Sequence, residues 1–321
     1  MTSYPRHKAT QSAYESANDA RDWLYQTPLD ILIKASNGAS DFGNKFGQPL
    51  IVGSLLTFEH QERDPEYDTR MLGYDKVIML AGGVGYSKSE YAQKKHPKKG
   101  DKVIILGGDN YRIGMGGAAV SSADTGAFGS AIELNAIQRS NPEMQKRAAN
   151  AIRALVESDD NPIISVHDHG AGGHLNCLSE LVEETGGTIN IDQLPLGDPT
   201  LSEKEIIGNE SQERMGLVVP EHALPLLNEL ADRERAPLYE VGEITGDHRF
   251  SFYSEKRGSR PIDLALSDFF GSAPKMVLTD QTMPRSYTEL QYSLEHFHTY
   301  LDQVLSLEAV ACKDWLTNKV D

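Results

Sequence analysis

Cysteine is scarce in this chain, and neither its number nor its spacing supports a covalent framework. Only two of the 321 residues are cysteines, Cys177 and Cys312. They are too far apart in sequence to form a zinc-binding motif, and two thiols do not make the disulfide framework of a small secreted domain. The sequence therefore predicts a reducing compartment, and we expect a cytoplasmic protein.

Long apolar runs and an excess of positive charge are also missing. No apolar stretch approaches the ~18 residues of a membrane-spanning helix, and the N-terminus lacks an apolar signal-peptide core. Asp and Glu number 47 against 31 Lys and Arg, which gives a formal net charge of −16. This balance is unfavourable for binding to nucleic acid or to an anionic membrane, although a local loop can still bind a phosphate.

What is present favours a large folded chain. Hydrophobic residues make up 39% of the sequence and charged residues 24%, enough for a sizeable core in one large domain or two ordinary ones. The pattern divides the chain into a polar segment 1–28, an N-terminal subdomain 29–100, an α/β subdomain 101–270 and a helical linker 271–321.

The first hundred residues show short apolar runs separated by polar stretches. Ile31–Ile33, Leu50–Phe58 and Val77–Leu80 are predicted as strands, and the glycine- and asparagine-rich segment 36–49 as a loop. The segment 87–100 is rich in Lys and His. A solvated loop is the main interpretation of that segment, and a phosphate-binding patch is the alternative.

The segment 101–270 alternates strand and helix patterns. Strands are predicted at Val103–Leu106, Ile163–Val166, Thr188–Ile191 and Leu217–Val219, with Leu238–Ile244 and Arg249–Tyr253 as a strand pair around Thr245–His248. Helices are predicted after Asn141, with Pro142 in the first turn, near His174 and after Pro220. This order predicts a layered α/β unit.

The stretch Asn161–Gly173, NPIISVHDHGAGG, places a carboxylate beside a glycine turn. Asp168 is predicted to follow a buried strand, and Gly170, Gly172 and Gly173 precede a helix. Glycine lets the backbone approach a ligand, helix N–H groups bind phosphate oxygens, and a carboxylate can hold Mg²⁺. The alternative is an ordinary strand–turn–helix connection with a capping Asp.

Three other polar groups and one thiol stand out. The glycine loop running from Gly107 to Ser121 and Ser122 lacks the ending of a P-loop and does not match a dinucleotide fingerprint. Gln138 lies just before a helix, where capping is the simpler interpretation. The run Asn209–Met215, NESQERM, is either a solvated turn before the strand at Leu217 or a ligand contact. Cys177 is predicted as a buried structural thiol.

Taken together, these motifs resemble the large single-chain form of formylglycinamidine ribonucleotide (FGAM) synthases. GGDNYRIGMGGAAVSS, AIQRSNPEM, NPIISVHDHGAGGHLN and NESQERM occur in this order, and NKFGQP at Asn44–Pro49 is similar to the family's Asn-x-Phe-Gly-x-Pro loop. The resemblance covers about Asp75–Lys275. It implies an α/β subdomain like the C-terminal one of aminoimidazole ribonucleotide synthase, with an incomplete N-terminal subdomain and a C-terminal helical linker.

The resemblance also implies a function and a set of partners. The family converts formylglycinamide ribonucleotide, ATP and glutamine to FGAM, ADP, phosphate and glutamate in purine biosynthesis, with Mg²⁺ at the phosphates. The chain corresponds to the later part of the first synthetase half. We therefore expect it to be inactive alone, to need a second synthetase half and a glutaminase domain, and to be able to self-associate through exposed interdomain faces. The alternatives are a non-catalytic binding module or another ATP-using member of the superfamily.

Roles for individual residues follow from the same resemblance. Asp168 is implied as a Mg²⁺ ligand, with Gln138 near the metal or substrate. His167 matches a family histidine and is a catalytic candidate without an assigned step. The residues implied to bind substrate or nucleotide are Ser211, Gln212, Glu213 and Arg214, the cradle residues Gly116, Gly117, Ser121 and Ser122, and Asn44.

Overall fold

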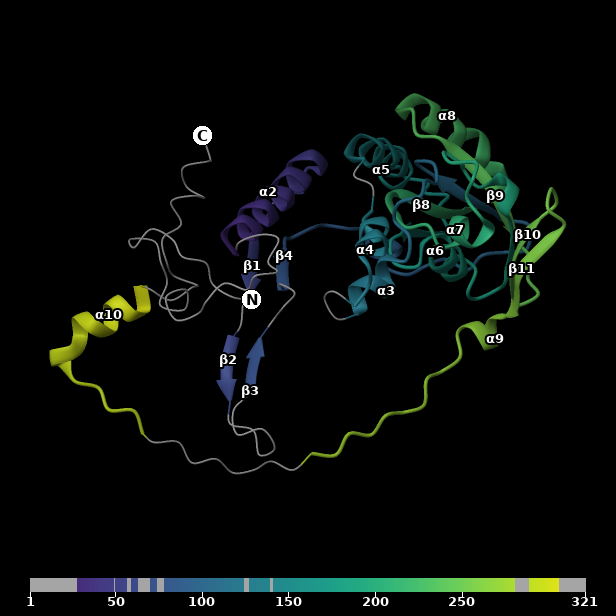
Figure 1. The fold of residues 1–321 in the computed structure, drawn as a ribbon. Helices are drawn as coiled ribbons and strands as arrows, with labels where there is room; N and C mark the ends of the chain where they lie inside the picture. The colour runs from purple at the N-terminus through teal and green to yellow at the C-terminus, as the bar shows by residue number, and fades with distance from the viewer. Residues whose placement is uncertain are drawn as a thin grey trace. The chain divides into compact units, whose positions relative to one another are not determined.

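The computed structural model describes residues 28–48, 50–56, 59–62, 70–73, 78–123, 127–138, 141–280 and 289–305. The chain divides into two compact units (Figure 1). The larger comprises residues 87–275, and the smaller combines 1–86 with 276–321. The boundary expected after residue 100 therefore falls inside the larger unit. The predicted polar segment before residue 28 and the predicted helix beyond Leu305 lie outside the described residues.

Among the described residues of the larger unit, seven strands form one sheet in the order β11-β10-β7-β9-β5-β8-β6. The strands are β5 (Lys102–Leu106), β6 (Ser165–His169), β7 (Gly187–Asn190), β8 (Ser211–Val219), β9 (Leu238–Ile244), β10 (Arg249–Ser254) and β11 (Ser259–Ala265). β7 and β10 are parallel, and the other neighbouring strands pair antiparallel. The sheet and its helices confirm the predicted α/β class.

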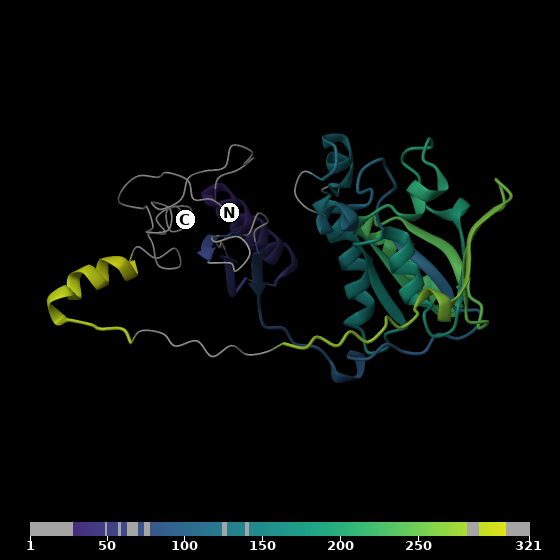
Figure 2. The same ribbon diagram turned by 60° about the horizontal axis from the view of Figure 1, so that its bottom comes forward.

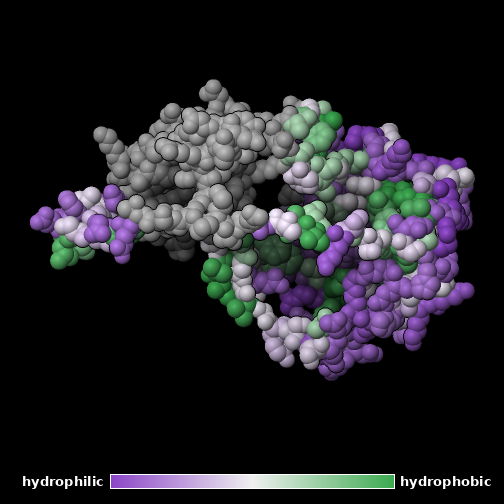
Figure 3. Space-filling view, turned by 90° about the horizontal axis from the view of Figure 1, so that it is seen from below, coloured by the Kyte–Doolittle hydropathy of each residue, from purple (hydrophilic) through white to green (hydrophobic). Residues whose placement is uncertain are grey.

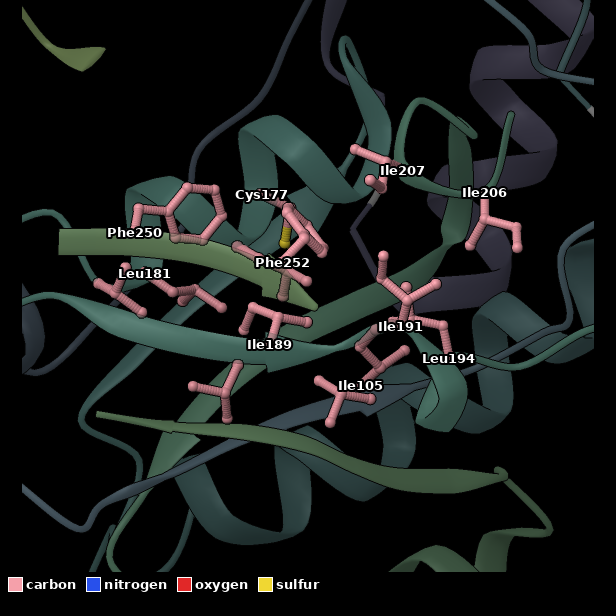
Figure 4. Packing of buried hydrophobic residues seen from close by; sticks show 14 of the residues in the cluster. Ile105, Cys177, Leu181, Ile189, Ile191, Leu194, Ile206, Ile207, Phe250 and Phe252 are labelled. Atoms are coloured by element: carbon pink, nitrogen blue, oxygen red, sulfur yellow. The ribbon is translucent and has the colours of Figure 1, made fainter. Parts of the chain in front are cut away.

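The interior strand β5 is buried on both faces of the sheet. Successive side chains of a strand point to opposite sides, so they enter two different clusters. Ile104 and Leu106 join one apolar cluster with helices α5 (Pro142–Val156) and α8 (Leu224–Glu234). Val103 and Ile105 join the other, with α6 (Gly173–Leu181) and α7 (Glu203–Ile207). Figures 1 and 2 show the helices on either side of the sheet, and Figure 4 shows the second cluster. The core of the unit is thus a three-layer α/β/α sandwich.

The strands β9 and β10 are not a hairpin, and the prediction that they pair with each other is wrong. β7 lies between them, antiparallel to β9 and parallel to β10. Phe250 and Phe252 of β10 are buried in the same cluster as Ile189 of β7, so this order buries apolar side chains from all three strands. At Gly242 of β9 a side chain would collide with the backbone of Thr188, so the close approach of β7 requires glycine there.

The start of helix α5 confirms the prediction made from its capping residues. The Asn141 side chain accepts a hydrogen bond from the Met144 N–H at 3.1 Å, and Pro142 occupies the first turn. The cap satisfies an N–H that has no partner within the helix, and proline is tolerated at that position because it has no N–H to satisfy. The buried face of the helix carries Ala148, Ala151 and Leu155.

The described part of the smaller unit contains helices α2 (Pro28–Phe46) and α10 (Phe297–Leu305) and two two-stranded antiparallel sheets. β1 (Val52–Leu56) pairs antiparallel with β4 (Ile78–Gly82), and β2 (Glu59–Glu62) pairs with β3 (Arg70–Gly73). No described helix is long and apolar enough to cross a membrane.

Helix α2 overturns two predictions, a strand at Ile31–Ile33 and a loop over residues 36–49. Its glycines and asparagines suggested a loop, but side chains four residues apart are neighbours on a helix. Phe42 and Phe46 stack in this way, with ring centroids 4.5 Å apart. The contact between aromatic rings favours the helix over the irregular structure that local composition indicated.

The surface of the larger unit is largely hydrophilic in the view of Figure 3, with separate hydrophobic patches. Helix α4 (Ser130–Ala136) and the residue after it contribute exposed apolar side chains at Ile132, Leu134 and Ile137. Faces of this kind are compatible with the expected self-association, which stays a prediction.

Candidate functional site

The polar motif Asn209–Met215 enters strand β8, so the interpretation as a solvated turn is wrong. Ser211, Glu213 and Arg214 are buried, and Gln212 is exposed. β6 and β8 are in register as far as the pair Asp168–Met215, after which the register shifts and His169 pairs with Ser211. Such an irregularity bends a strand and re-aims its side chains. Residues 212–214 therefore lie between the partners of Asp168 and His169, without a partner of their own on β6.

Arg214 is fully buried and joins three segments of the chain. Its Nη1 donates to Asn110 Oδ1 and lies 3.0 Å from His174 Nε2, and its Nη2 donates to the backbone and side-chain oxygens of Asn209, both at 2.7 Å. A buried charge needs such hydrogen bonds to offset the loss of water. The resemblance implied a contact with the ribonucleotide, but the structure places this guanidinium inside the protein, where it holds loops together.

Two buried histidines accompany the guanidinium. The rings of His169 and His174 meet edge to face with centroids 4.7 Å apart, and neither residue is exposed. Burial, followed by the positive charge of Arg214, holds the pKa of both imidazoles well below the usual range. Both rings are therefore neutral at physiological pH. Cys177 lies on α6, as His174 does. Burial raises the pKa of its thiol, and the prediction of a buried cysteine is confirmed.

Asp168 is exposed and closes the glycine turn at the end of β6. Its Oδ1 accepts a hydrogen bond from the Gly170 N–H at 2.8 Å. His167 Nδ1 lies 3.0 Å from the Asp168 backbone oxygen, and its Nε2 contacts the Glu180 carboxylate of α6. The carboxylate thus has the local turn-closing role that was the alternative prediction, and it also remains open to solvent.

Mg²⁺ commonly binds through one or two carboxylates together with substrate phosphates, and it keeps several waters. Within the described ranges, no three His, Cys, Asp or Glu side chains come together as metal ligands. One exposed carboxylate at Asp168 fits a metal held mainly by nucleotide phosphates, and does not fit a closed cage of protein ligands.

The predicted cradle residues lie at helix α3 (Gly117–Ser122). Gly116 caps this helix with a positive φ of 69°. Ser121 and Ser122 are exposed, and each hydroxyl donates to the Ala118 backbone oxygen, at 3.1 and 2.8 Å. Gly117 has the carboxylate of Glu210 beside it, because a Cβ there would lie 2.5 Å from Glu210 Oε2. The first residue of α3, rather than Ser121 or Ser122, therefore lies beside Glu210.

Gln138 joins the same group of loops, whereas Asn44 belongs to the other unit. Gln138 Nε2 donates to Glu210 Oε2 at 3.3 Å. Asn44 lies in the last turn of α2, in the smaller unit, and is exposed. The structure therefore assembles one loop cluster within the larger unit. It consists of the segment 110–118, Gln138, the glycine turn 168–174 and the segment 209–214.

Sequence reasoning missed four buried polar residues that organise this cluster, namely Asn110, His174, Asn209 and Glu210. Asn209 and Glu210 belong to the NESQERM motif, so their position was indicated although their role was not. The Asn209 amide donates to the backbone oxygens of Tyr111 and Ile113 at 2.8 and 2.9 Å. Asn110 gave no local signal, because its partners lie 64 or more residues away along the chain.

Comparison with known proteins agrees with this architecture. Residues 98–255 match the family described as AIR synthase related protein, C-terminal domain. The phosphoribosylformylglycinamidine synthase of Homo sapiens is 38% identical over 315 residues, covering 92% of this chain and 23% of that protein. The Drosophila melanogaster enzyme of the same name is 36% identical over 334 residues, covering 96% of this chain and 24% of that protein.

Solved structures from Thermotoga maritima show the same fold. PurL complexed with FGAR has a TM-score of 0.59 and 24% identity, over 79% of this chain and 40% of that one. The PurLQS structure has a TM-score of 0.56 and 22% identity, over 86% of this chain and 42% of that one.

The sheet and its glycine loops agree with the match of residues 98–255 to the AIR synthase related C-terminal domain. The chain as a whole is a partial homologue of phosphoribosylformylglycinamidine (FGAM) synthase, which confirms the predicted resemblance. It spans less than a quarter of the length of these curated relatives.

Proposed function

We propose that this chain forms part of an ATP-dependent ligase that makes FGAM in purine biosynthesis. The observation that carries the proposal is the identity of 36–38% to FGAM synthases over more than nine tenths of the chain. Thermotoga maritima PurL structures complexed with FGAR and with ATP support the same substrates. The reaction consumes formylglycinamide ribonucleotide, ATP and glutamine and yields FGAM, ADP, phosphate and glutamate.

In this proposal the loop cluster binds ribonucleotide and nucleotide groups. Phosphorylation of the substrate amide oxygen makes a good leaving group, which ammonia then displaces. Asp168 would hold Mg²⁺, which neutralises phosphate charge when it is bound. The exposed Gln212 and the adjacent Ser211 would contact the ribonucleotide, and Arg214 would keep that strand in place from within the core.

The rest of the active site and the source of ammonia are proposed to lie in other segments of the complete enzyme. A second synthetase half and a glutaminase domain are the partners that this reaction requires. We propose a cytoplasmic location, which fits the scarcity of cysteine. By itself the chain is expected to bind nucleotide weakly and to show no turnover with ATP, formylglycinamide ribonucleotide and ammonia.

The role of Asp168 can be separated from its role in the turn by two substitutions. Asp168→Asn keeps an oxygen for the Gly170 N–H but removes the charge, whereas Asp168→Ala removes both. We expect Asp168→Asn to change the free energy of unfolding of the native chain by no more than about 0.5 kcal/mol, and Asp168→Ala to lower it by about 1 kcal/mol. Both variants should lose the Mg²⁺-dependent part of ATP binding, measured by calorimetry with and without Mg²⁺.

Equal Mg²⁺-dependent affinities in the native chain and in Asp168→Asn would refute the proposed metal ligand. Absence of ATP binding by the native chain at millimolar nucleotide would instead favour a non-catalytic module. Steady turnover by the chain alone would contradict the proposal that it supplies only part of an active site.

A further inference from the structure

Glu210 is a buried carboxylate at the meeting point of three loops that are distant in sequence. It is 3% exposed. Its Oε1 accepts hydrogen bonds from the backbone N–H groups of Ala118 at 3.2 Å and Gly172 at 3.1 Å. Its Oε2 accepts one from the side-chain amide of Gln138 at 3.3 Å. One side chain therefore contacts the start of α3, the N-cap of α6 and the segment before α5.

The backbone on either side of this carboxylate is also anchored. The Glu210 N–H donates to the Gly114 backbone oxygen at 2.8 Å, and the preceding residue, Asn209, forms a bridge with Met115. Arg214 holds Asn209 from the other side. The Glu210 side chain is therefore projected from a fixed point, and its carboxylate position is determined by the core.

The charge of Glu210 suits its partners. Gly172 caps the nine-residue helix α6, where N–H groups without helical partners create a partial positive charge that favours an anion. A carboxylate that accepts several N–H bonds is a strong, charge-assisted acceptor. Glycine at position 117 leaves the space that the carboxylate needs. The backbone N–H groups of Ala118 and Gly172 are therefore already occupied by a protein anion. The sequence had indicated the glycine turn before α6 as a possible site for a ligand phosphate.

We propose that Glu210 is a positioning residue that couples the α3 loop, the glycine turn before α6 and Gln138 into one unit. Ligand phosphates then meet other groups of the loops, while Glu210 maintains the spacing between them. Loss of its carboxylate releases the amides of Ala118 and Gly172 together. The consequence for nucleotide affinity rests on the proposed function, whereas the coupling of the loops does not.

Hydrogen exchange of the 321-residue chain tests the coupling directly. In Glu210→Ala, the amides of Ala118 and Gly172 should both exchange about tenfold faster or more, as expected for loss of a buried charged acceptor. In Glu210→Gln, which keeps an acceptor oxygen for both amides, the acceleration should be smaller. The Gly170 amide, which donates to Asp168, should change little. In Glu229→Gln, which removes a charge from an exposed position on α8, none of these amides should change.

A second control separates positioning from general loss of stability. Leu227 of α8 is fully buried on the side of the sheet opposite to α6. Leu227→Ala should speed the exchange of β5 amides. The Glu210 variants should leave β5 amides protected. Sodium formate should restore protection of both loop amides in Glu210→Ala, because it supplies a carboxylate to the vacated space.

Three outcomes would overturn the proposal: unchanged protection of Ala118 and Gly172 in Glu210→Ala, release of only one of them, or equal acceleration of β5. ATP affinity measured on the same samples tests the consequence, with a loss of about tenfold or more expected in Glu210→Ala. If the native chain binds no ATP, the proposed function fails, and the exchange result still decides the role of Glu210.

Discussion

Replacing Arg214 with methionine is expected to lower the free energy of unfolding by about 4 kcal/mol, because several buried polar groups lose their partner at once. Methionine fills part of the space but offers no hydrogen to Asn110 Oδ1 or to the two oxygens of Asn209. Asn110 Oδ1 keeps His174 Nε2 as a neighbour at 3.0 Å, whereas both Asn209 oxygens lose their bonds to Arg214 Nη2. The measurement is urea unfolding, with the midpoint expected to fall and the slope to stay constant.

Two further arginine variants make this test specific. Arg214→Lys keeps the charge but cannot reproduce the planar fork of donors, so we expect about half of the loss. Arg153→Met removes an exposed arginine that pairs with Glu157 one turn away on α5, and it should cost about 0.5 kcal/mol or less. A loss below about 1 kcal/mol for Arg214→Met would show that the buried network does not hold the loops together.

Gly173→Ala is the second substitution expected to have a large effect. Gly173 has a φ of 58°, and a Cβ there would lie 2.6 Å from the Asn209 carbonyl carbon and 2.8 Å from its nitrogen. The left-handed conformation costs an alanine about 1 kcal/mol, and displacement of packed backbone adds about 2 kcal/mol more. The expected loss is therefore about 3 kcal/mol, measured by the same urea titration.

Gly258 provides a matched control for the backbone conformation alone. Its φ is 60°, nearly that of Gly173, but no heavy atom lies within 4 Å of a Cβ added there. Gly258→Ala should therefore cost only about 1 kcal/mol. Equal losses in the two alanine variants would mean that the contact between the glycine turn and Asn209 contributes nothing to the stability of the loop cluster.

Local patterns were sufficient where neighbours in sequence make the structure. The apolar run that became β5 is buried on both faces, and Asn141 caps α5 with Pro142 in the first turn. The glycines around Asp168 indicated a turn between a strand and a helix, which the structure shows. In each case the decisive contacts are within a few residues of the chain.

Local patterns failed where distant segments decide the structure. β7 separates β9 from β10 because it can bury Ile189 beside Phe250 and Phe252, a contact that no local turn pattern encodes. The same reason explains Arg214, which looks like a ligand-binding residue in a polar motif. Its partners Asn110 and His174 lie 104 and 40 residues away.

By itself, the sequence determined the α/β class, the family and the order of the motifs, because these depend on short-range patterning and on residue identity at fixed spacing. Only the tertiary structure decided which polar residues are available to a ligand. It turned Arg214 and Glu210 inward as partners of loop backbone and left Asp168 and Gln212 exposed. The physical reason is that a buried polar group must be hydrogen-bonded, and its partners are brought to it by folding.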